Sequence, residues 1–346
     1  MHQYQNILII KMSALGDVIH ALPCAVALRE LYPKARITWL VHPQFGALLP
    51  EEPILDEVIY FDKVEFNRLA LPGKIKKLWQ LRQYLHAQKF DLAIDLQGLF
   101  KSAVVAALSG ANRKIGYNYM REGSSLISKP IHGQHDNGHV VQQYLDVIRY
   151  LGSSIEEPVF PKLNLDTELL EINKRVNLEA YGKTWEDTVV LVPGAGWPTK
   201  EWPIHHFVEL SKRLIEDGKI IILAGGPVEK TKGQAIINGL QKQQAINLIG
   251  RTNLRQLAAL MSKAKLCIGG DTGPLHVAAA MNCEAIALFG PTKAERNGPY
   301  GKHIQIIVSP VPCNYNFRTK EEIKDNCMEK ITVDEVYDAA RHKLST

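Results

Sequence analysis

A lone carboxylate, Asp17, follows the apolar run at 7–10 and stands where a helix is predicted to begin, next to Gly16. One carboxylate held near an acceptor hydroxyl is enough for general-base chemistry, because the base has only one proton to remove during attack. A carboxylate in the first turn of a helix also serves as a cap that the helix dipole favours. Both interpretations of Asp17 stay open.

Two glycine-rich loops carry one charged residue each that suits nucleotide binding. The loop 193–203 contains Gly194 in a Gly-x-Gly, but Pro198 interrupts the dinucleotide spacing, which argues against NAD. Lys200 in this loop suits a phosphate contact, with plain solvent exposure as the alternative. The loop 225–231 has Glu229 where a P-loop needs glycine, which excludes that class of NTPase. Glu229 could accept hydrogen bonds from ribose hydroxyls. The alternative is a surface carboxylate in the first turn of a helix.

The most informative loop is Gly269-Gly270-Asp271-Thr272-Gly273-Pro274-Leu275-His276. Small residues at a strand end let the backbone approach a ligand, and the free amides of the following helix form an anion site. The pattern predicts a diphosphate there, its charge met by amides, Thr272 and Lys200. A tight turn without ligand is the alternative. His276 by itself is explained nearly as well by a core histidine.

Metal and disulfide chemistry are not predicted. His132, His135, Asp136 and His139 lie close in sequence, but they share no clear helix face and no thiolate accompanies them. The chain has no Asp-x-Asp, so a metal-clamped nucleotide sugar is not supported, and no cofactor is expected. The five cysteines are few and odd in number, which favours free thiols in a reducing compartment. Cys313 and Cys327 fit no common zinc spacing.

Strand-like runs alternate with helical patterns in both halves, which predicts βαβ units and parallel sheets. The fold class is therefore α/β, with two Rossmann-like domains whose sheets face a central cleft. The expected domains are 1–165 and 186–346, joined by a polar linker at about 166–185. The expected strands are 6–10, 36–41, 91–96, 188–192, 219–224, 266–270 and 284–289, and the expected helices include 18–31, 101–108, 205–217 and 276–281.

Composition and charge limit the remaining classes. Of 346 residues, 46% are hydrophobic and 22% charged, which is typical of a globular chain without a membrane span or signal peptide. A net charge of +5 does not indicate a nucleic-acid coat. Residues 63–89 nevertheless contain seven Lys or Arg against one acid, Glu65. This segment is a solvated helix face or a docking surface for an anionic partner, such as a phosphorylated glycolipid or a membrane. Its helix is expected to bury Ile75, Leu78, Leu81 and Leu85.

At these loops the sequence resembles the ADP-heptose:lipopolysaccharide heptosyltransferases, glycosyltransferase family 9, over nearly the whole chain. The resemblance is carried by Ser-Ala-Leu-Gly-Asp at 13–17, Gly-Ala-Gly-Trp-Pro-Thr-Lys-Glu-Trp-Pro at 194–203, Gly-Asp-Thr-Gly-Pro-Leu-His at 270–276 and Phe-Gly-Pro-Thr at 289–292. The motif Asp-Leu-Gln-Gly-Leu-Phe-Lys-Ser at 95–102 is similar to the first-heptose subgroup in particular, and Arg121-Glu122 matches a family loop near the acceptor.

The resemblance implies a GT-B fold and an inverting, metal-independent transfer. It implies that Asp17 is the catalytic base and that the acceptor contacts Lys101 and Arg121. It places the nucleotide sugar mainly on the C-terminal domain, with one contact, Gly16, from the N-terminal domain. The C-terminal contacts are Gly194, Lys200, Glu229, Asp271, Thr272, Gly273 and His276. The basic region 61–77 departs from the family, which carries an arginine cluster there. Lysine binds phosphate less specifically than arginine, because its ammonium does not form the two parallel hydrogen bonds that a guanidinium forms.

The expected function is heptose transfer from ADP-heptose to an anionic glycolipid of the Kdo-lipid A type, without nucleic-acid partners. The expected location is cytoplasmic, with a peripheral contact at the inner face of the inner membrane. Alternatives are a family-9 transferase with another sugar or acceptor, a non-catalytic sugar-nucleotide-binding protein and, more distantly, a dinucleotide oxidoreductase. A pure binding protein has no need of a base at Asp17.

Overall fold

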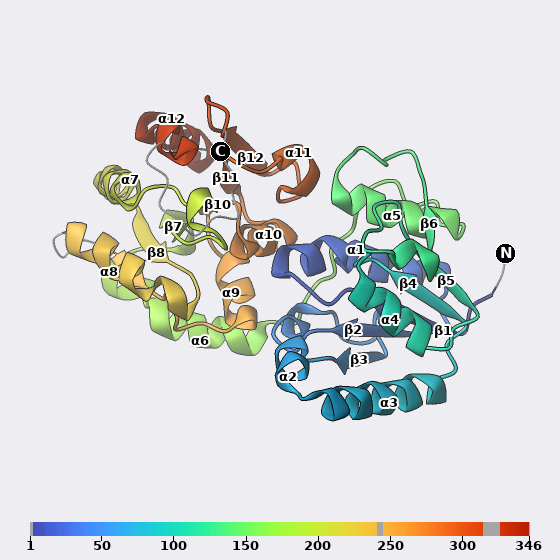
Figure 1. Cartoon of the computed structure of the whole chain (residues 1–346). Coiled ribbons are helices and arrows are strands. Elements are labelled where there is room, and N and C mark those ends of the chain that lie inside the picture. Colours follow the sequence, from blue (N-terminus) through green and yellow to red (C-terminus); the bar gives the residue numbers. More distant parts are fainter. Residues whose placement is uncertain (1–2, 241–244, 314–325, 346) are drawn as a thin grey trace. The chain divides into compact units, whose positions relative to one another are not determined.

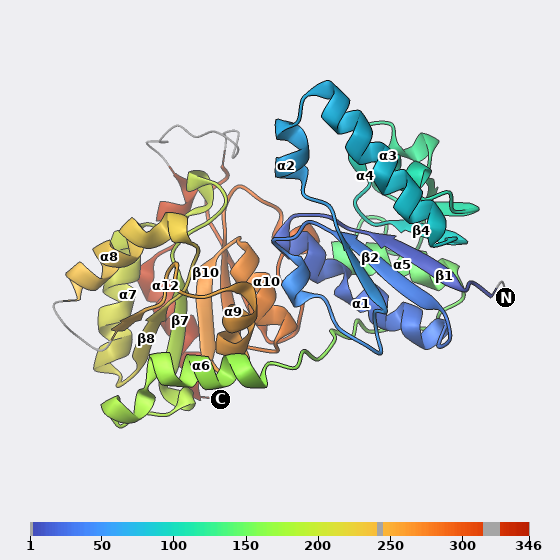
Figure 2. The ribbon, with the colours of Figure 1, turned by 90° about the horizontal axis from the view of Figure 1, so that it is seen from below.

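The computed structural model describes residues 3–240, 245–313 and 326–345, and the chain divides into two compact units, Met1–Leu163 and Asn164–Thr346. Each unit is built on one six-stranded parallel sheet that helices cover (Figures 1 and 2). The prediction of two Rossmann-like domains is therefore confirmed.

The first strand of the chain lies in the middle of the first sheet. Its strands are β1 (Asn6–Ile10), β2 (Arg36–Val41), β3 (Glu57–Tyr60), β4 (Leu92–Asp95), β5 (Arg113–Tyr117) and β6 (Lys129–Ile131). Their order is β3-β2-β1-β4-β5-β6, so strands are added on one side of β1 up to β3 and on its other side from β4 onward. The strand order therefore reverses between β1 and β4. Ile9 pairs with Trp39 on one side and Ile94 on the other. All three are fully buried, as expected for parallel strands covered on both faces.

The second sheet repeats this order. Its strands are β7 (Thr188–Val192), β8 (Ile220–Leu223), β9 (Ala245–Asn247), β10 (Leu266–Gly270), β11 (Ala285–Phe289) and β12 (Ile304–Val308). The order β12-β11-β10-β7-β8-β9 places β7 beside β10. The reversal therefore falls between these two strands. In open parallel sheets, ligands bind at the carboxyl ends of the strands that flank such a reversal.

The helices of the first unit are α1 (Leu15–Leu31), α2 (Lys63–Arg68), α3 (Leu71–Ala87), α4 (Phe100–Leu108) and α5 (Val140–Tyr150). The expectation for α3 is partly wrong. Leu85 is buried and Leu78 and Leu81 are half-buried, but Ile75 is 60% exposed. Six residues separate Ile75 from Leu81, and at 3.6 residues per turn this rotates Ile75 about 120° away from the packed side.

The helices of the second unit are α6 (Asp166–Val176), α7 (Ile204–Glu216), α8 (Lys230–Gly239), α9 (Leu254–Met261), α10 (Gly273–Ala280), α11 (Ala294–Asn297) and α12 (Val333–Ser345). Residues 166–185, expected as a linker, are structured instead. Helix α6 buries Ile172 and Val176, and its Glu168 accepts a 2.6 Å hydrogen bond from Arg255 of α9. The segment is polar in composition because only these few apolar positions carry its packing.

The expectation of five free thiols is wrong for one pair. Cys313 and Cys327 form a disulfide with their Cα atoms 5.6 Å apart. Cys327 lies close to Gly290, since a Cβ there would lie 2.7 Å from the Cys327 sulfur. Cys24, Cys267 and Cys283 are free and buried. Burial raises the pKa of each of these thiols, which keeps them protonated and unreactive.

Candidate active site

Asp17 occupies the first turn of α1, directly after the carboxyl end of β1. The helix begins at Leu15, three residues earlier than expected, with Ala14 as its N-cap. One Asp17 oxygen accepts the Ala14 amide at 3.2 Å, and the other lies 3.9 Å from the ammonium of Lys11. The Asp17 side chain is still 45% exposed. The carboxylate is therefore held in place on one side and open to a substrate on the other.

Lys11 is a buried cation that sequence reasoning missed. It is 2% exposed, and its ammonium donates to the Leu96 carbonyl at 3.0 Å and to the Tyr144 hydroxyl at 2.6 Å. A lysine that ends an uninterrupted apolar strand is the signal for it, but lysine is almost never fully buried. The Lys11 ammonium therefore places a buried positive charge beneath the loop that leads to Asp17.

The motif at 95–102 holds the neighbouring loop in place. Asp95 is completely buried and accepts the Gln97 and Gly98 amides and the Ser102 hydroxyl at 2.9–3.0 Å. Burial raises the pKa of the Asp95 carboxyl, and these hydrogen bonds oppose that change. Gln97 in turn accepts the amides of Met12 and Ser13, each at 3.0 Å. The loops after β1 and β4 are thus fixed to each other at the reversal of the sheet.

A pocket of about 420 Å³ lies beside these loops, within the first unit. Its lining is mostly apolar and comes from α2, α3, α4 and adjoining loops, including Phe45, Phe61, Phe66, Phe100, Val104, Val105, Leu78, Met12, Ser13, Lys63 and Lys101. Burial and the nearby Lys63 ammonium lower the pKa of Lys101. Two cations that repel each other in one pocket are stabilised when an anion binds between them.

Arg121 reaches the same neighbourhood through its backbone. Its amide donates to the Gly98 carbonyl at 2.8 Å, and the next residue, Glu122, accepts the Phe100 amide at 3.2 Å. The guanidinium itself is exposed and lies over the Tyr119 ring at 5.2 Å. The structure therefore brings the loop of Arg121 against the helix that carries Lys101.

The second unit places Lys200 and Asp271 together at the reversal between β7 and β10. The Lys200 ammonium donates to Asp271 at 2.6 Å, and Thr292 donates to the same carboxylate oxygen at 2.7 Å. His276 lies 3.9 Å from the other oxygen. Burial by itself raises the pKa of Asp271, but the contacts with His276 and Lys200 outweigh it and hold the pKa well below its usual range. Asp271 therefore stays ionised and orients Lys200.

The start of α10 lies next to this ion pair. The helix begins at Gly273, earlier than expected, so Thr272 is its N-cap with an extended backbone and no side-chain cap. The chain at Lys200 approaches closely, since a Cβ on Gly270 would lie 2.7 Å from the Lys200 carbonyl oxygen. The start of α10 and the Lys200–Asp271 pair thus lie close together in the chain fold, and a helix start of this kind suits phosphate oxygens.

Glu229 lies against two glycine loops. A Cβ on Gly194 would lie 2.2 Å from its Cγ, and Cβ atoms on Gly225 and Gly226 would lie 3.3 and 3.1 Å from its Oε2. This Oε2 is buried and has no hydrogen-bond partner among the described residues. An unsatisfied buried carboxylate oxygen is costly, and a hydroxyl donor from a ligand would satisfy it.

If ADP is the ligand, as the resemblance implies, we expect Gly194→Ala to weaken its binding, because the new methyl group must displace the Glu229 side chain. The expected loss is about tenfold, the value of one hydrogen bond to a charged group. Gly196→Ala is the matched control, since no atom lies within 4 Å of a Cβ there. Isothermal titration with ADP measures both variants. Equal affinities for the two would show that the position of Glu229 does not matter for the nucleotide.

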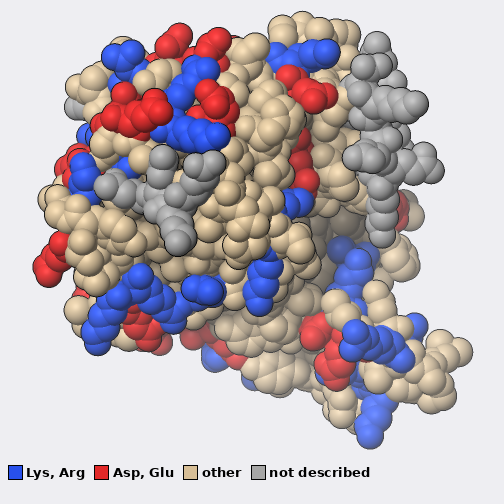
Figure 3. Space-filling view, turned by 90° about the vertical axis from the view of Figure 1, so that its left-hand side faces the viewer, with Lys and Arg blue, Asp and Glu red and all other residues tan. Residues whose placement is uncertain are grey.

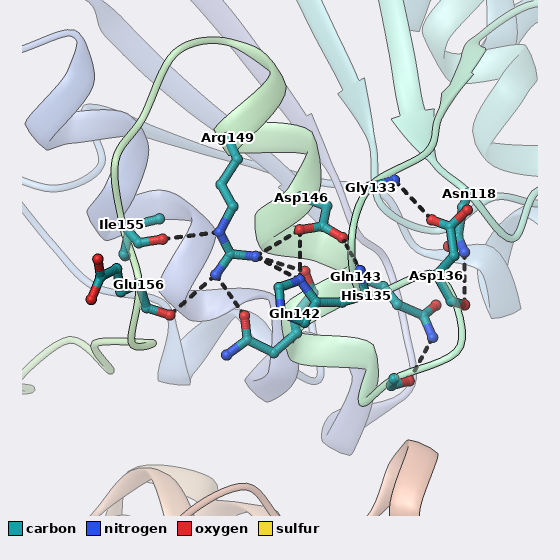
Figure 4. A network of polar contacts seen from close by, with 11 residues as sticks. Asn118, Gly133, His135, Asp136, Gln142, Gln143, Asp146, Arg149, Ile155 and Glu156 are labelled. Atoms are coloured by element: carbon teal, nitrogen blue, oxygen red, sulfur yellow. Dashed lines mark hydrogen bonds and ion pairs between the residues drawn. The ribbon is translucent and has the colours of Figure 1, made fainter.

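The histidine-rich loop at 132–139 takes part in a network of polar contacts with α5 that stabilises the fold (Figure 4). His132 contacts Asp136 at 2.6 Å, and His135 and Arg149 both contact Asp146, at 2.9 and 2.7 Å. Asp146 is almost completely buried on α5, so these partners compensate its charge. Among the described residues, no group of three or more His, Cys, Asp or Glu is placed to hold a metal ion.

Two Rossmann-like units of the same strand order, each with its charged loops at the reversal of the sheet, define the GT-B class of glycosyltransferases. Residues 78–326 match the sequence model of glycosyltransferase family 9 (heptosyltransferase), and the chain belongs to this family. It is therefore an enzyme, a glycosyltransferase.

Relatives of known name are similar to this chain over most of its length, and they are lipopolysaccharide heptosyltransferases. The chain is 28% identical to lipopolysaccharide heptosyltransferase 1 of Pseudomonas aeruginosa over 326 residues, covering 89% of this chain and 85% of the relative. It is 27% identical to lipopolysaccharide heptosyltransferase 2 of Escherichia coli, covering 87% of each.

Solved structures share the fold. A family 9 glycosyltransferase from Veillonella parvula matches with a TM-score of 0.82 and 22% identity, covering 100% of this chain and 98% of the other. E. coli heptosyltransferase WaaC with ADP matches with a TM-score of 0.79 and 24% identity, covering 98% of this chain and 100% of the other. Within the described residues, none of the helices has the length and hydropathy that a membrane span needs.

Proposed function

We propose that this enzyme transfers a heptose from ADP-heptose to the inner core of lipopolysaccharide, on an acceptor of the Kdo-lipid A type. The relatives named above are lipopolysaccharide heptosyltransferases, and one similar solved structure is E. coli WaaC with ADP-2-deoxy-2-fluoro heptose. The observation that carries the proposal is the Lys200–Asp271 pair at the start of α10, because it supplies an oriented cation and helix amides for a diphosphate.

The second unit is proposed to bind the donor. Thr272, Gly273 and the α10 amides face the diphosphate, Lys200 contacts it, and Asp271 and His276 orient Lys200. Glu229, which has a free oxygen beside Gly194, accepts the ribose hydroxyls. The charge that develops on the departing ADP is met by Lys200 and the amides, so no metal is required in this scheme.

The first unit is proposed to bind the acceptor. Lys101 and Arg121 contact its anionic groups, and the position of the pocket next to Met12 and Ser13 brings bound acceptor close to Asp17. Asp17 removes the proton of the acceptor hydroxyl while that oxygen forms a bond to the anomeric carbon. The bond from this carbon to the diphosphate breaks on the opposite face, so the configuration inverts. Gly16, in the first turn of α1, has no side chain and leaves room for the sugar beside Asp17. The enzyme is proposed to act on the cytoplasmic side, at the inner face of the inner membrane.

ADP release from ADP-heptose, with and without a Kdo-lipid A acceptor, tests the proposal. We expect release that depends on the acceptor. Tight ADP binding without release would instead indicate a family-9 protein with another sugar or acceptor. A protein that neither binds ADP nor releases it would contradict the nucleotide assignment itself.

A further inference from the structure

Helix α3 carries an apolar stripe on its outer face. Leu71, Ile75 and Trp79 are 70%, 60% and 56% exposed, and they follow one another at intervals of four residues. This spacing stacks the three side chains along one side of a helix. The packed side is formed by Leu78, Leu81 and Leu85, of which Leu85 belongs to the core of the first unit. The stripe therefore points away from its own unit, and α3 runs along the outside of that unit (Figures 1 and 2).

The helix that carries the stripe is basic. On the molecular face drawn in Figure 3, Lys and Arg side chains are interspersed with Asp and Glu. By contrast, α3 has four basic residues, Lys74, Lys76, Lys77 and Arg82, and no acidic one. Lys77 pairs with Glu65 of α2 at 3.1 Å, which leaves that carboxylate engaged. Exposed Lys76 and Arg82 lie on the same helix as the stripe.

We propose that α3 docks this enzyme on the surface of an anionic phospholipid bilayer. A helix that combines exposed Leu, Ile and Trp with Lys and Arg lies in the plane of a membrane interface, its apolar side chains among the acyl chains and its cations among the headgroups. Trp favours this interfacial depth. Seventeen residues give a contact about 25 Å long. Charge complementarity favours an anionic surface as the partner, because α3 itself carries no acidic residue.

The inference deepens the proposed function and rests on it for its purpose, which is to keep the enzyme where a membrane-embedded acceptor lies. Binding to vesicles that contain neither acceptor nor nucleotide sugar tests the docking separately. Vesicles of phosphatidylcholine with phosphatidylglycerol are compared with phosphatidylcholine alone by co-sedimentation. We expect binding only to the anionic vesicles, reduced by salt.

Variants of exposed residues separate the contributions that the apolar and the basic side chains of α3 make to vesicle binding. We expect Ile75→Ser with Trp79→Ser to lower the partition coefficient at least tenfold. Lys76→Gln with Arg82→Gln should lower it about 25-fold at low salt, since each cation near an anionic surface contributes about fivefold. Leu170→Ser on α6, where Leu170 is 63% exposed, is the matched control and should bind like the wild type. Brominated lipid should quench the fluorescence of Trp79, a signal that Trp79→Phe loses.

Two further outcomes decide the matter. The Ile75→Ser, Trp79→Ser variant should keep wild-type transfer to a deacylated, water-soluble acceptor and lose transfer to acceptor in vesicles. If the proposed function is wrong, the wild-type protein will transfer heptose to neither acceptor, although it still binds anionic vesicles. The docking proposal is overturned if anionic vesicles do not bind the protein, or if both α3 variants bind them normally. A self-association that these variants abolish, without vesicle binding, would assign the stripe to a second copy of the chain.

Discussion

Replacing Asp17 with Asn should lower turnover by about 10²–10⁴-fold, the usual contribution of a general base. Asn retains the volume of Asp and an oxygen that accepts the Ala14 amide, so the start of α1 should keep its geometry. It has no basic oxygen for the acceptor proton. ADP affinity should stay near that of the wild type, because the nucleotide contacts are proposed on the second unit. Initial rates of ADP release and titration with ADP measure the two effects.

Asp334→Asn is the matched control for this substitution. Asp334 is also an exposed carboxylate in the first turn of a helix, α12, where it pairs with Arg213. It should leave turnover unchanged. Unchanged turnover in Asp17→Asn would remove Asp17 from the mechanism. A loss of ADP affinity as large as the loss of rate would assign Asp17 to donor binding instead.

Lys200→Ala should damage both folding and nucleotide binding. The Lys200 and Asp271 side chains are only 14% and 12% exposed, so the variant leaves a carboxylate buried without its principal cation. Breaking such a pair costs about 3 kcal/mol in the free energy of unfolding. Loss of a charged hydrogen bond to phosphate should weaken ADP binding by about 10–100-fold. Thermal and urea unfolding measure the first effect and titration measures the second.

The stability effect has a defined pH dependence. The pKa of Asp271 is lowered by folding, so its pairing stabilises the protein at pH values above the carboxyl pKa of the unfolded chain. That contribution is lost as the pH falls through the folded pKa. The difference between wild type and Lys200→Ala should therefore be full at pH 7 and shrink below about pH 4. A difference that is constant between pH 7 and pH 3 would contradict the coupling of Lys200 to Asp271.

Two variants serve as controls for Lys200→Ala. Lys200→Arg keeps the charge and should recover most of the stability. Lys232→Ala removes another partly buried lysine of the same unit, one that pairs with Glu201, and should change ADP affinity little.

Local signals in the sequence identified most elements of the site. The runs at 6–10, 188–192 and 266–270 coincide with β1, β7 and β10, because short runs without charged residues are typical of strands buried on both faces. Helices α1 and α10 each begin three residues before the start that the sequence pattern predicts. Glycine and proline there obscure the periodicity, although Pro is well tolerated in the first helical turn.

Contacts between distant segments were beyond any local pattern. Lys200 and Asp271 meet across 71 residues only because β7 pairs with β10. The burial of Lys11, the contact of Glu229 with Gly194 and the Cys313–Cys327 disulfide likewise depend on which strands are neighbours. The packing of the whole sheet decides the strand order. Each apolar run would be buried equally well in several different orders, so the run alone does not select one.

The sequence by itself therefore determined the alternation of strands and helices, the charged glycine loops and the basic segment 63–89, since these follow from short-range sterics and periodicity. The tertiary structure alone decided that the loops after β1 and β4, and those after β7 and β10, meet in pairs. It also decided that α3 turns Ile75 outward with Leu71 and Trp79. Both outcomes depend on the free energy of burying surfaces far apart in the chain, which no local window contains.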